Sequence, residues 1–134
     1  MKFVMEHLGL PARNPLALKD WYVKVLDAKL VFSDGQTPPA FFVQFPGGMV
    51  LEIYQANSSR TETSDNSLAG WRHVAFQVES IPAARPLLER RGVIFTEAVR
   101  PAGGGGSVLY FRDGEDNLLH LVERPEQSQF LRPV

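Results

Sequence analysis

The chain has 134 residues, the size of one ordinary domain, and is long enough to bury a hydrophobic core. A hydrophobic content of 44% and a charged content of 22% are typical of a soluble globular protein and exclude general disorder. The net charge of -1 argues against nucleic acid and anionic membranes as partners, and the absence of cysteine excludes disulfides, thiolate catalysis and sulfur-rich zinc sites.

The first half of the chain predicts the element order β-α-β-β-β. Asn14 and Pro15 are a typical helix start, a cap residue followed by proline at the first helical position. Apolar residues then recur at helical spacing, which predicts a helix over residues 15–26. Pro11 is expected to end the first strand. The predicted strands are Phe3–Leu10, Lys29–Ser33, Ala40–Phe45 and Met49–Gln55.

The second half predicts the same order after a polar linker over residues 57–70. Ser80 is the expected helix cap and Gly92 the helix end, with Pro86 favouring a kink between them. The sequence thus predicts one α+β domain over 1–134, with modules at 1–56 and 71–124 and a tail at 125–134. The predicted strands are Arg72–Val78, Val93–Glu97, Ser107–Arg112 and Asn117–Glu123.

Four polar residues occupy matching places in the two halves. His7 opens "HLGL" and His73 opens "HVAF", 66 residues later; Glu52 follows the first by 45 residues, and His120 follows the second by 47. Side chains alternate along a strand, so each of the four is predicted to lie opposite the apolar face of its strand. With helices on the outer face, a curled mixed sheet would enclose an open cup lined by these groups.

Such a His/Glu/His/His cluster offers nitrogen and oxygen ligands suited to zinc, nickel, iron(II), manganese or cobalt. The alternative is that each is an ordinary polar side chain of a strand. Gln77 and Tyr54 share the faces of the candidate ligands on their strands, and either is a candidate substrate contact or a structural residue. Arg13 and Arg100 are candidates for holding an anionic substrate, with solvated surface arginines as the alternative. Gly103–Gly106 lacks the phosphate-loop pattern and predicts a flexible hairpin loop or lid.

The chain resembles the vicinal oxygen chelate superfamily, which includes glyoxalase I, extradiol dioxygenases and the fosfomycin and bleomycin resistance proteins. The resemblance covers residues 3 to about 124 and lies in "HLGL", "LKDWYVKVLDAKLVF", "LEIY", "HVAFQVES" and "YFRDGEDNLLHLVERP". It implies two βαβββ modules, a homodimer, a small oxygen-rich substrate and a divalent metal held by His7, Glu52 and His73. The cup would form within one chain or between two subunits.

The fourth ligand position departs from the family pattern "NLLELVE", because His120 stands where Glu is usual. Glu123 is expected on the opposite face and so cannot replace it. His120 is therefore a fourth ligand or the proton-transfer group of a glyoxalase-like lyase or isomerase. An iron-dependent ring-cleaving dioxygenase and a metal-free drug- or metabolite-binding protein are the alternatives. The lack of a signal peptide or an 18-residue apolar stretch favours a cytoplasmic location.

Overall fold

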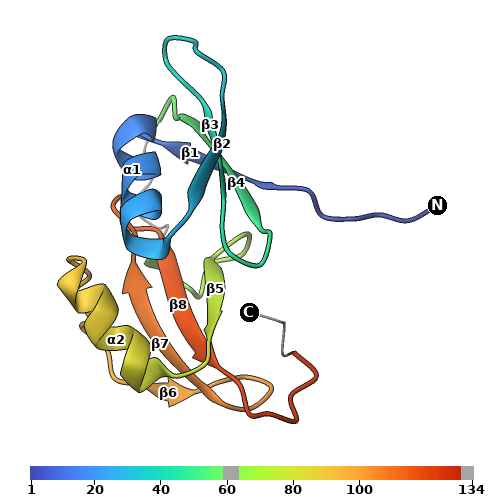
Figure 1. Ribbon diagram of the computed structural model, residues 1–134, viewed down its shortest axis with the longest axis vertical. Helices are drawn as coiled ribbons and strands as arrows, with labels where there is room; N and C mark the ends of the chain where they lie inside the picture. Colours follow the sequence, from blue (N-terminus) through green and yellow to red (C-terminus); the bar gives the residue numbers. More distant parts are fainter. Residues whose placement is uncertain (59–63, 131–134) are drawn as a thin grey trace. The chain divides into compact units, whose positions relative to one another are not determined.

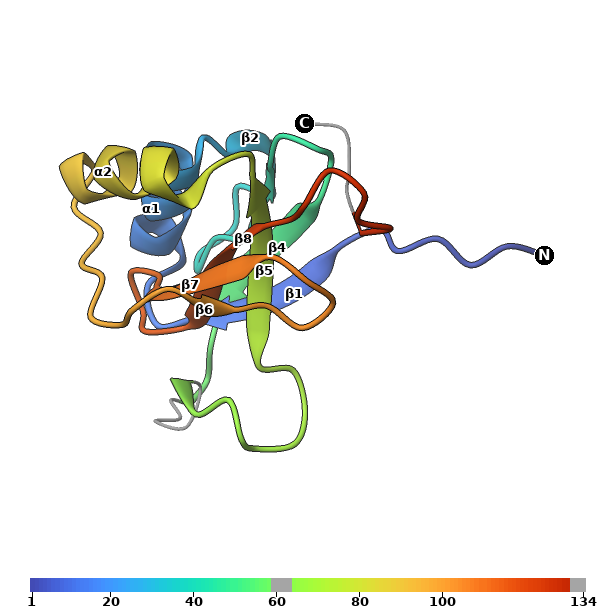
Figure 2. The same cartoon turned by 90° about the horizontal axis from the view of Figure 1, so that it is seen from below.

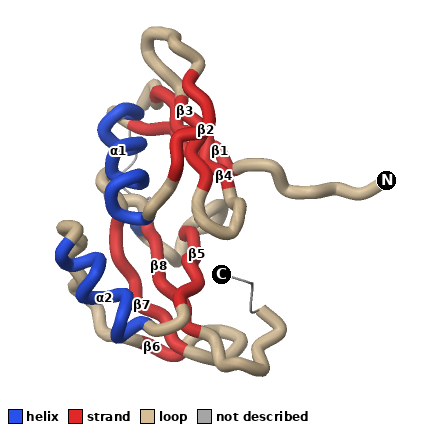
Figure 3. Tube along the Cα trace, viewed as in Figure 1, coloured by secondary structure: helices blue, strands red, loops and turns tan. Residues whose placement is uncertain are grey.

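The structure of the protein, a computed structural model, describes residues 1–58 and 64–130. The chain divides into two compact units, Met1–Ser59 and Arg60–Val134, and the division falls inside the polar stretch predicted as a linker. The described part of each unit contains one helix and one four-stranded mixed sheet (Figure 1; Figure 3). The predicted α+β class with two modules is therefore confirmed.

The first unit is built on a sheet with the strand order β1-β4-β3-β2. β1 runs parallel to β4, and the other neighbours are antiparallel. Asn14 caps the helix as predicted, since its Oδ1 accepts a hydrogen bond of 3.0 Å from the Ala17 amide. The elements are β1 (Leu8–Ala12), α1 (Pro15–Leu26), β2 (Lys29–Ser33), β3 (Phe41–Gln44) and β4 (Val50–Gln55).

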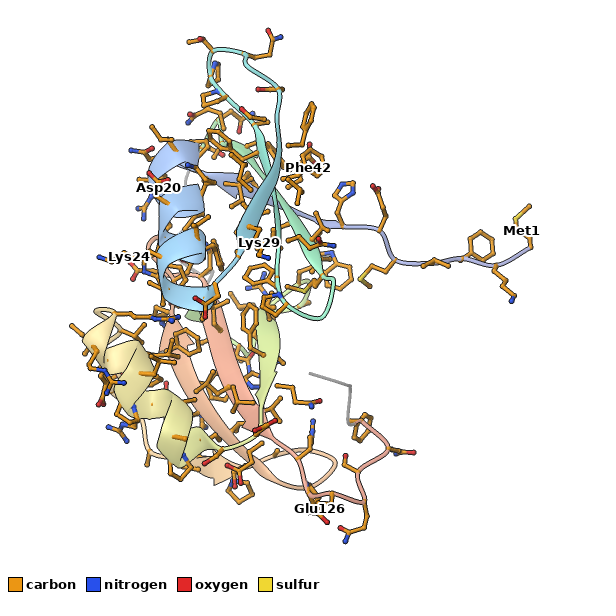
Figure 4. All side chains as sticks on the ribbon, in the orientation of Figure 1. Met1, Asp20, Lys24, Lys29, Phe42 and Glu126 are labelled. Carbon is orange, nitrogen blue, oxygen red and sulfur yellow. The ribbon has the colours of Figure 1, made fainter. Side chains whose placement is uncertain are left out.

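One face of this sheet packs against α1 and forms the core of the unit. The side chains that alternate onto it are almost wholly buried, and Lys19 of the helix lies 5.2 Å from the Phe41 ring centroid. Phe42 projects from the face away from α1, while Asp20 and Lys24 lie on the helix side remote from the sheet (Figure 4). The buried set is Leu18, Tyr22, Val25, Phe41, Val43, Leu51 and Ile53.

The second unit repeats this topology, with the strand order β5-β8-β7-β6 and β5 parallel to β8. Its helix α2 lies over one face of the sheet, beside β7 and β8 (Figure 2). Ser80 is the cap of α2, as predicted, and accepts a 3.3 Å hydrogen bond from the Ala83 amide. The elements are β5 (His73–Val78), α2 (Ile81–Arg90), β6 (Arg100–Pro101), β7 (Ser107–Arg112) and β8 (Leu118–Glu123).

Two predicted strands differ from the structure by more than one residue at an end. The first strand begins at Leu8 rather than Phe3 and continues through Pro11 to Ala12. Phe3 is 93% exposed, in an arm before the strand, and Pro11 is tolerated because β1 pairs with β4 on one side only.

The strand predicted over Val93–Glu97 does not form. The Val93 amide bonds back to the Leu88 carbonyl of α2, and the Phe95 ring packs 5.6 Å from the Phe111 ring. Val93 and Phe95 therefore pack against the core from a connecting segment, whereas Ile94 is 80% exposed, and the short strand β6 follows later. No helix in the described ranges is long and apolar enough to cross a membrane.

Candidate metal centre

The first unit brings together the two candidate ligands predicted from its half of the sequence. His7 immediately precedes β1, and Gly9, two residues later, is paired with Glu52 on β4. Glu52 is in turn paired with Phe42 on β3. The His7 Nε2 atom lies 3.3 Å from Glu52 Oε2, and the His7 ring stands edge-on to the Phe42 ring at 5.4 Å. Both polar groups thus share the face away from α1.

The second unit brings together His73 and His120 in the same register. Ala75, two residues after His73, is paired with His120 on β8, and His120 is paired with Tyr110 on β7. The two imidazole centroids are 4.9 Å apart, and the Tyr110 ring lies 4.9 Å from that of His120. The repeat seen in the sequence is therefore also a repeat of strand register, with His120 in the place of Glu52.

All three histidines of the chain bind an oxygen acceptor through Nδ1. The partner of His7 is Glu6 Oε2 at 2.8 Å, that of His73 is Asn66 Oδ1 at 2.8 Å, and that of His120 is the Leu121 carbonyl oxygen at 3.1 Å. Since these oxygens accept, Nδ1 is the donor in each contact, and a ring that carries only this proton has its lone pair on Nε2. Metal-binding histidines in proteins are held in this way by their second ring nitrogen.

His120 is the most buried of the four residues, at 6% exposure. Burial lowers the pKa of this imidazole, and the nearby charges of His73 and Arg124 lower it further, while the hydrogen bond to Leu121 acts in the opposite direction. His120 is accordingly held in the neutral form at neutral pH. A neutral imidazole can either bind a metal or accept a proton.

Asn66 is a contributing residue that sequence reasoning missed, because it lies in the polar stretch assigned to the linker. Asp65 Oδ1 accepts hydrogen bonds from the amide and the hydroxyl of Ser67, at 3.0 and 2.6 Å. This turn positions the Asn66 amide oxygen against His73. The signal was the Asp-Asn-Ser run, which is typical of a side-chain-stabilised turn.

Glu123 has a structural contact remote from the histidines. Its Oε2 accepts a 2.7 Å hydrogen bond from the Ile81 amide, at the first residue of α2. A carboxylate there satisfies a helix N–H and interacts favourably with the helix dipole. The expectation that Glu123 faces away from His120 agrees with this contact.

The residues predicted as candidate substrate contacts are divided between the two units. Arg100 lines a pocket beside His73 and His120, and Ala102 and Gly103 at the start of the glycine-rich loop line it too. Arg13 follows β1 in the first unit, where its carbonyl accepts a hydrogen bond from Gln55. Tyr54 covers Gly9, whose absent Cβ would stand 3.4 Å from the Tyr54 ring. Gln77 lies on β5 in the predicted strand.

The four ligands predicted from sequence are thus found as two pairs, one in each unit. Within residues 1–58 and 64–130, no group of three or more His, Cys, Asp or Glu side chains stands ready to hold a metal. Each pair by itself supplies two candidate donor side chains.

Comparison with known proteins identifies the family. Residues 4–121 match the model of the Glyoxalase/Bleomycin resistance protein/Dioxygenase superfamily. The chain belongs to this superfamily. The predicted resemblance is therefore confirmed over most of the chain. Among curated proteins, none matches in sequence.

Solved structures share the fold over nearly the whole chain. A glyoxalase family protein from Enterococcus faecalis has 24% identity and a TM-score of 0.76, covering 90% of this chain and 97% of its own. A glyoxylase/bleomycin resistance protein/dioxygenase domain from Frankia sp. EAN1pec has 26% identity and a TM-score of 0.72, with 95% and 96% covered. The fosfomycin resistance protein FosX from Listeria monocytogenes, solved with Mn(II) and 1S,2S-dihydroxypropylphosphonic acid, has 19% identity and a TM-score of 0.69, with 95% and 94% covered.

Proposed function

We propose that this protein is a metal-dependent lyase or isomerase of the glyoxalase type, acting on a small oxygen-rich substrate. His7 and Glu52 from the first unit and His73 and His120 from the second would hold one divalent metal ion. The observation that carries the proposal is the identical strand register of the two pairs, with Nδ1 of every histidine within hydrogen-bond distance of an oxygen.

The donor set fits a divalent metal. Three imidazole nitrogens and one carboxylate suit zinc, nickel, iron(II) or manganese, and the Nδ1 hydrogen bonds already orient the rings. When bound, the metal would act as a Lewis acid on the substrate oxygens. The Mn(II) bound by FosX, on the same fold, supports the use of such an ion.

His120 is the residue proposed for proton transfer, or otherwise the fourth ligand. Its lowered pKa keeps Nε2 unprotonated at neutral pH, as a general base requires. The Leu121 carbonyl fixes the ring orientation, and the Tyr110 ring packs against it. The usual family carboxylate would bring a negative charge to this position, so His120 also changes the charge at the centre.

The test is metal analysis combined with matched variants. We expect the purified protein to bind one equivalent of zinc, nickel, iron(II) or manganese and to unfold at a higher temperature with the metal than after chelation. Glu52→Gln and His73→Gln should lower the affinity at least tenfold. Glu126→Gln, at an exposed site in the tail, removes the same charge as Glu52→Gln and should leave the affinity unchanged.

The activity assays distinguish the reaction classes. Loss of a thiol-hemiacetal substrate by the nickel or zinc form supports the glyoxalase-type reaction, and His120→Gln should abolish it while folding is retained. Oxygen uptake with catechols by the iron form would assign the protein to the ring-cleaving dioxygenases instead. Absence of metal binding under all these conditions would refute both enzyme proposals in favour of a binding protein.

We further propose that the whole chain acts as one domain, since both units would contribute ligands, and that it assembles as a homodimer, as the family resemblance implies. Light scattering coupled to size-exclusion chromatography should give twice the 15.0 kDa chain mass. Mixing the inactive variants Glu52→Gln and His73→Gln then tests where the centre forms. Recovery of activity on mixing would indicate centres shared between subunits, and no recovery would indicate centres within one chain.

A further inference from the structure

A pocket of about 370 Å³ lies within the second unit, beside the two histidines. His73, His120 and Tyr110 line it from the sheet, and Gly103 lines it from the glycine-rich loop. Its volume is at the small end of the range of ligand pockets in proteins. It can therefore take a compact molecule or one part of a larger one.

The lining of this pocket is positively charged. Its positive charges are those of Arg100 and Arg124, and the lining residues that the structure describes include no aspartate or glutamate. Arg100 is partly neutralised, because its Nη2 lies 2.7 Å from Glu97 Oε2, and its guanidinium stacks 4.9 Å from the Tyr110 centroid. The excess charge is thus concentrated at Arg124.

Arg124 is held in place by neutral groups. Its Nη1 donates to the carbonyl oxygens of Gly103 and Gly105, both at 2.6 Å, and its guanidinium lies 5.0 Å from the Phe130 ring centroid. Phe130 also packs on Gly104, where a Cβ would come within 2.5 Å of the ring. Among residues 1–58 and 64–130, no carboxylate forms an ion pair with Arg124.

This arrangement suits recognition of an oxyanion. A guanidinium whose orientation is already fixed loses little conformational entropy on binding, and its planar fork matches the oxygens of a carboxylate or phosphate. Both carbonyl contacts of Arg124 use Nη1, which leaves the N–H groups of Nη2 and Nε as donors for an anion. The absence of acidic lining residues means that an anion meets no repulsion there.

We infer that this pocket binds an oxyanion group of the substrate, a phosphate, phosphonate or carboxylate, with Arg124 as the principal contact and Arg100 as the second. The inference rests on the proposed function in one respect, since it names the substrate class as a small anionic molecule. Anion binding itself needs only the second unit's side chains and is measurable without metal.

The experiment is a titration of chelator-treated protein with inorganic phosphate, methylphosphonate and acetate, followed by NMR and calorimetry. We expect saturable binding of at least one anion, with shift changes at Gly103, Tyr110 and Arg124, and none with the neutral compound 1,2-propanediol. The comparison among the three anions identifies the group that the pocket prefers. Shift changes confined to other regions, or no saturable binding, would overturn the inference.

Two variants separate a specific contact from general charge. Arg124→Gln should weaken anion binding about tenfold or more, the usual effect of losing a charge-assisted hydrogen bond. Arg90→Gln, on the exposed side of α2, removes the same charge and should have no effect. Equal weakening by both variants would overturn the inference.

The outcome is independent of the metal test. Arg124-dependent anion binding by a protein that takes no metal would support the pocket and refute the proposed function. Metal binding without anion binding would refute the pocket alone.

Discussion

Replacing Glu123 by alanine tests whether this carboxylate is a structural group or belongs to the metal centre. The substitution removes the acceptor of the 2.7 Å hydrogen bond from the Ile81 amide at the start of α2. Hydrogen bonds to charged groups contribute about 1.5–3 kcal/mol, and Glu123 is only half-buried, so we expect a loss of about 1.5–2 kcal/mol. For a chain of this size that lowers the unfolding temperature by roughly 5–10 °C.

Glu123→Gln separates charge from hydrogen bonding. The glutamine oxygen can still accept from the Ile81 amide, so only the interaction of a negative charge with the helix N-terminus is lost, about 0.3–1 kcal/mol. Calorimetric unfolding of the two variants, with Glu126→Ala as an exposed control, measures these differences. Metal affinity should be unchanged in all three. Loss of metal from Glu123→Ala with unaltered stability would refute the assignment of Glu123 to the helix.

Three further outcomes follow from local geometry. Gly106→Ala should lower the free energy of unfolding by several kcal/mol, because at its φ of +91° the added Cβ would overlap the Glu123 carbonyl oxygen. Gly105→Ala has a similar φ of +92° but no close neighbour, so it should cost only about 1 kcal/mol. Equal unfolding temperatures of the two variants would contradict this. Ser80→Ala should lower the free energy of unfolding by about 0.5–2 kcal/mol through loss of the α2 cap, measured by urea denaturation. Because folding lowers the pKa of His120, the unfolded chain binds a proton at this residue more tightly than the folded chain does. In the presence of a chelator, the free energy of unfolding should therefore decrease as pH falls below about 6.5, and His120→Gln should reduce this pH dependence.

The structure confirms the helix caps and the bounds of two strands that the sequence predicts. Asn14 and Ser80 cap the two helices, and the strands Lys29–Ser33 and Ser107–Arg112 have the predicted bounds. Both kinds of element are governed by contacts between near neighbours in the chain and by a clear apolar period. Val93–Glu97 has the composition of a strand but forms none: Val93 and Phe95 pack against the core from a connecting segment, and Ile94 is exposed.

The sequence by itself determined the two-module α+β fold and the face of the sheet on which the polar residues lie, because strand alternation and a 66-residue repeat are properties of spacing alone. The family match and the topology confirm that fold. Only the tertiary structure shows which groups His73, Glu123 and Arg124 contact. Asn66 reaches His73 through a turn, Glu123 reaches α2 across 42 residues, and Arg124 reaches the glycine-rich loop across about 20. Such contacts depend on where distant segments meet in space, which residue spacing does not specify.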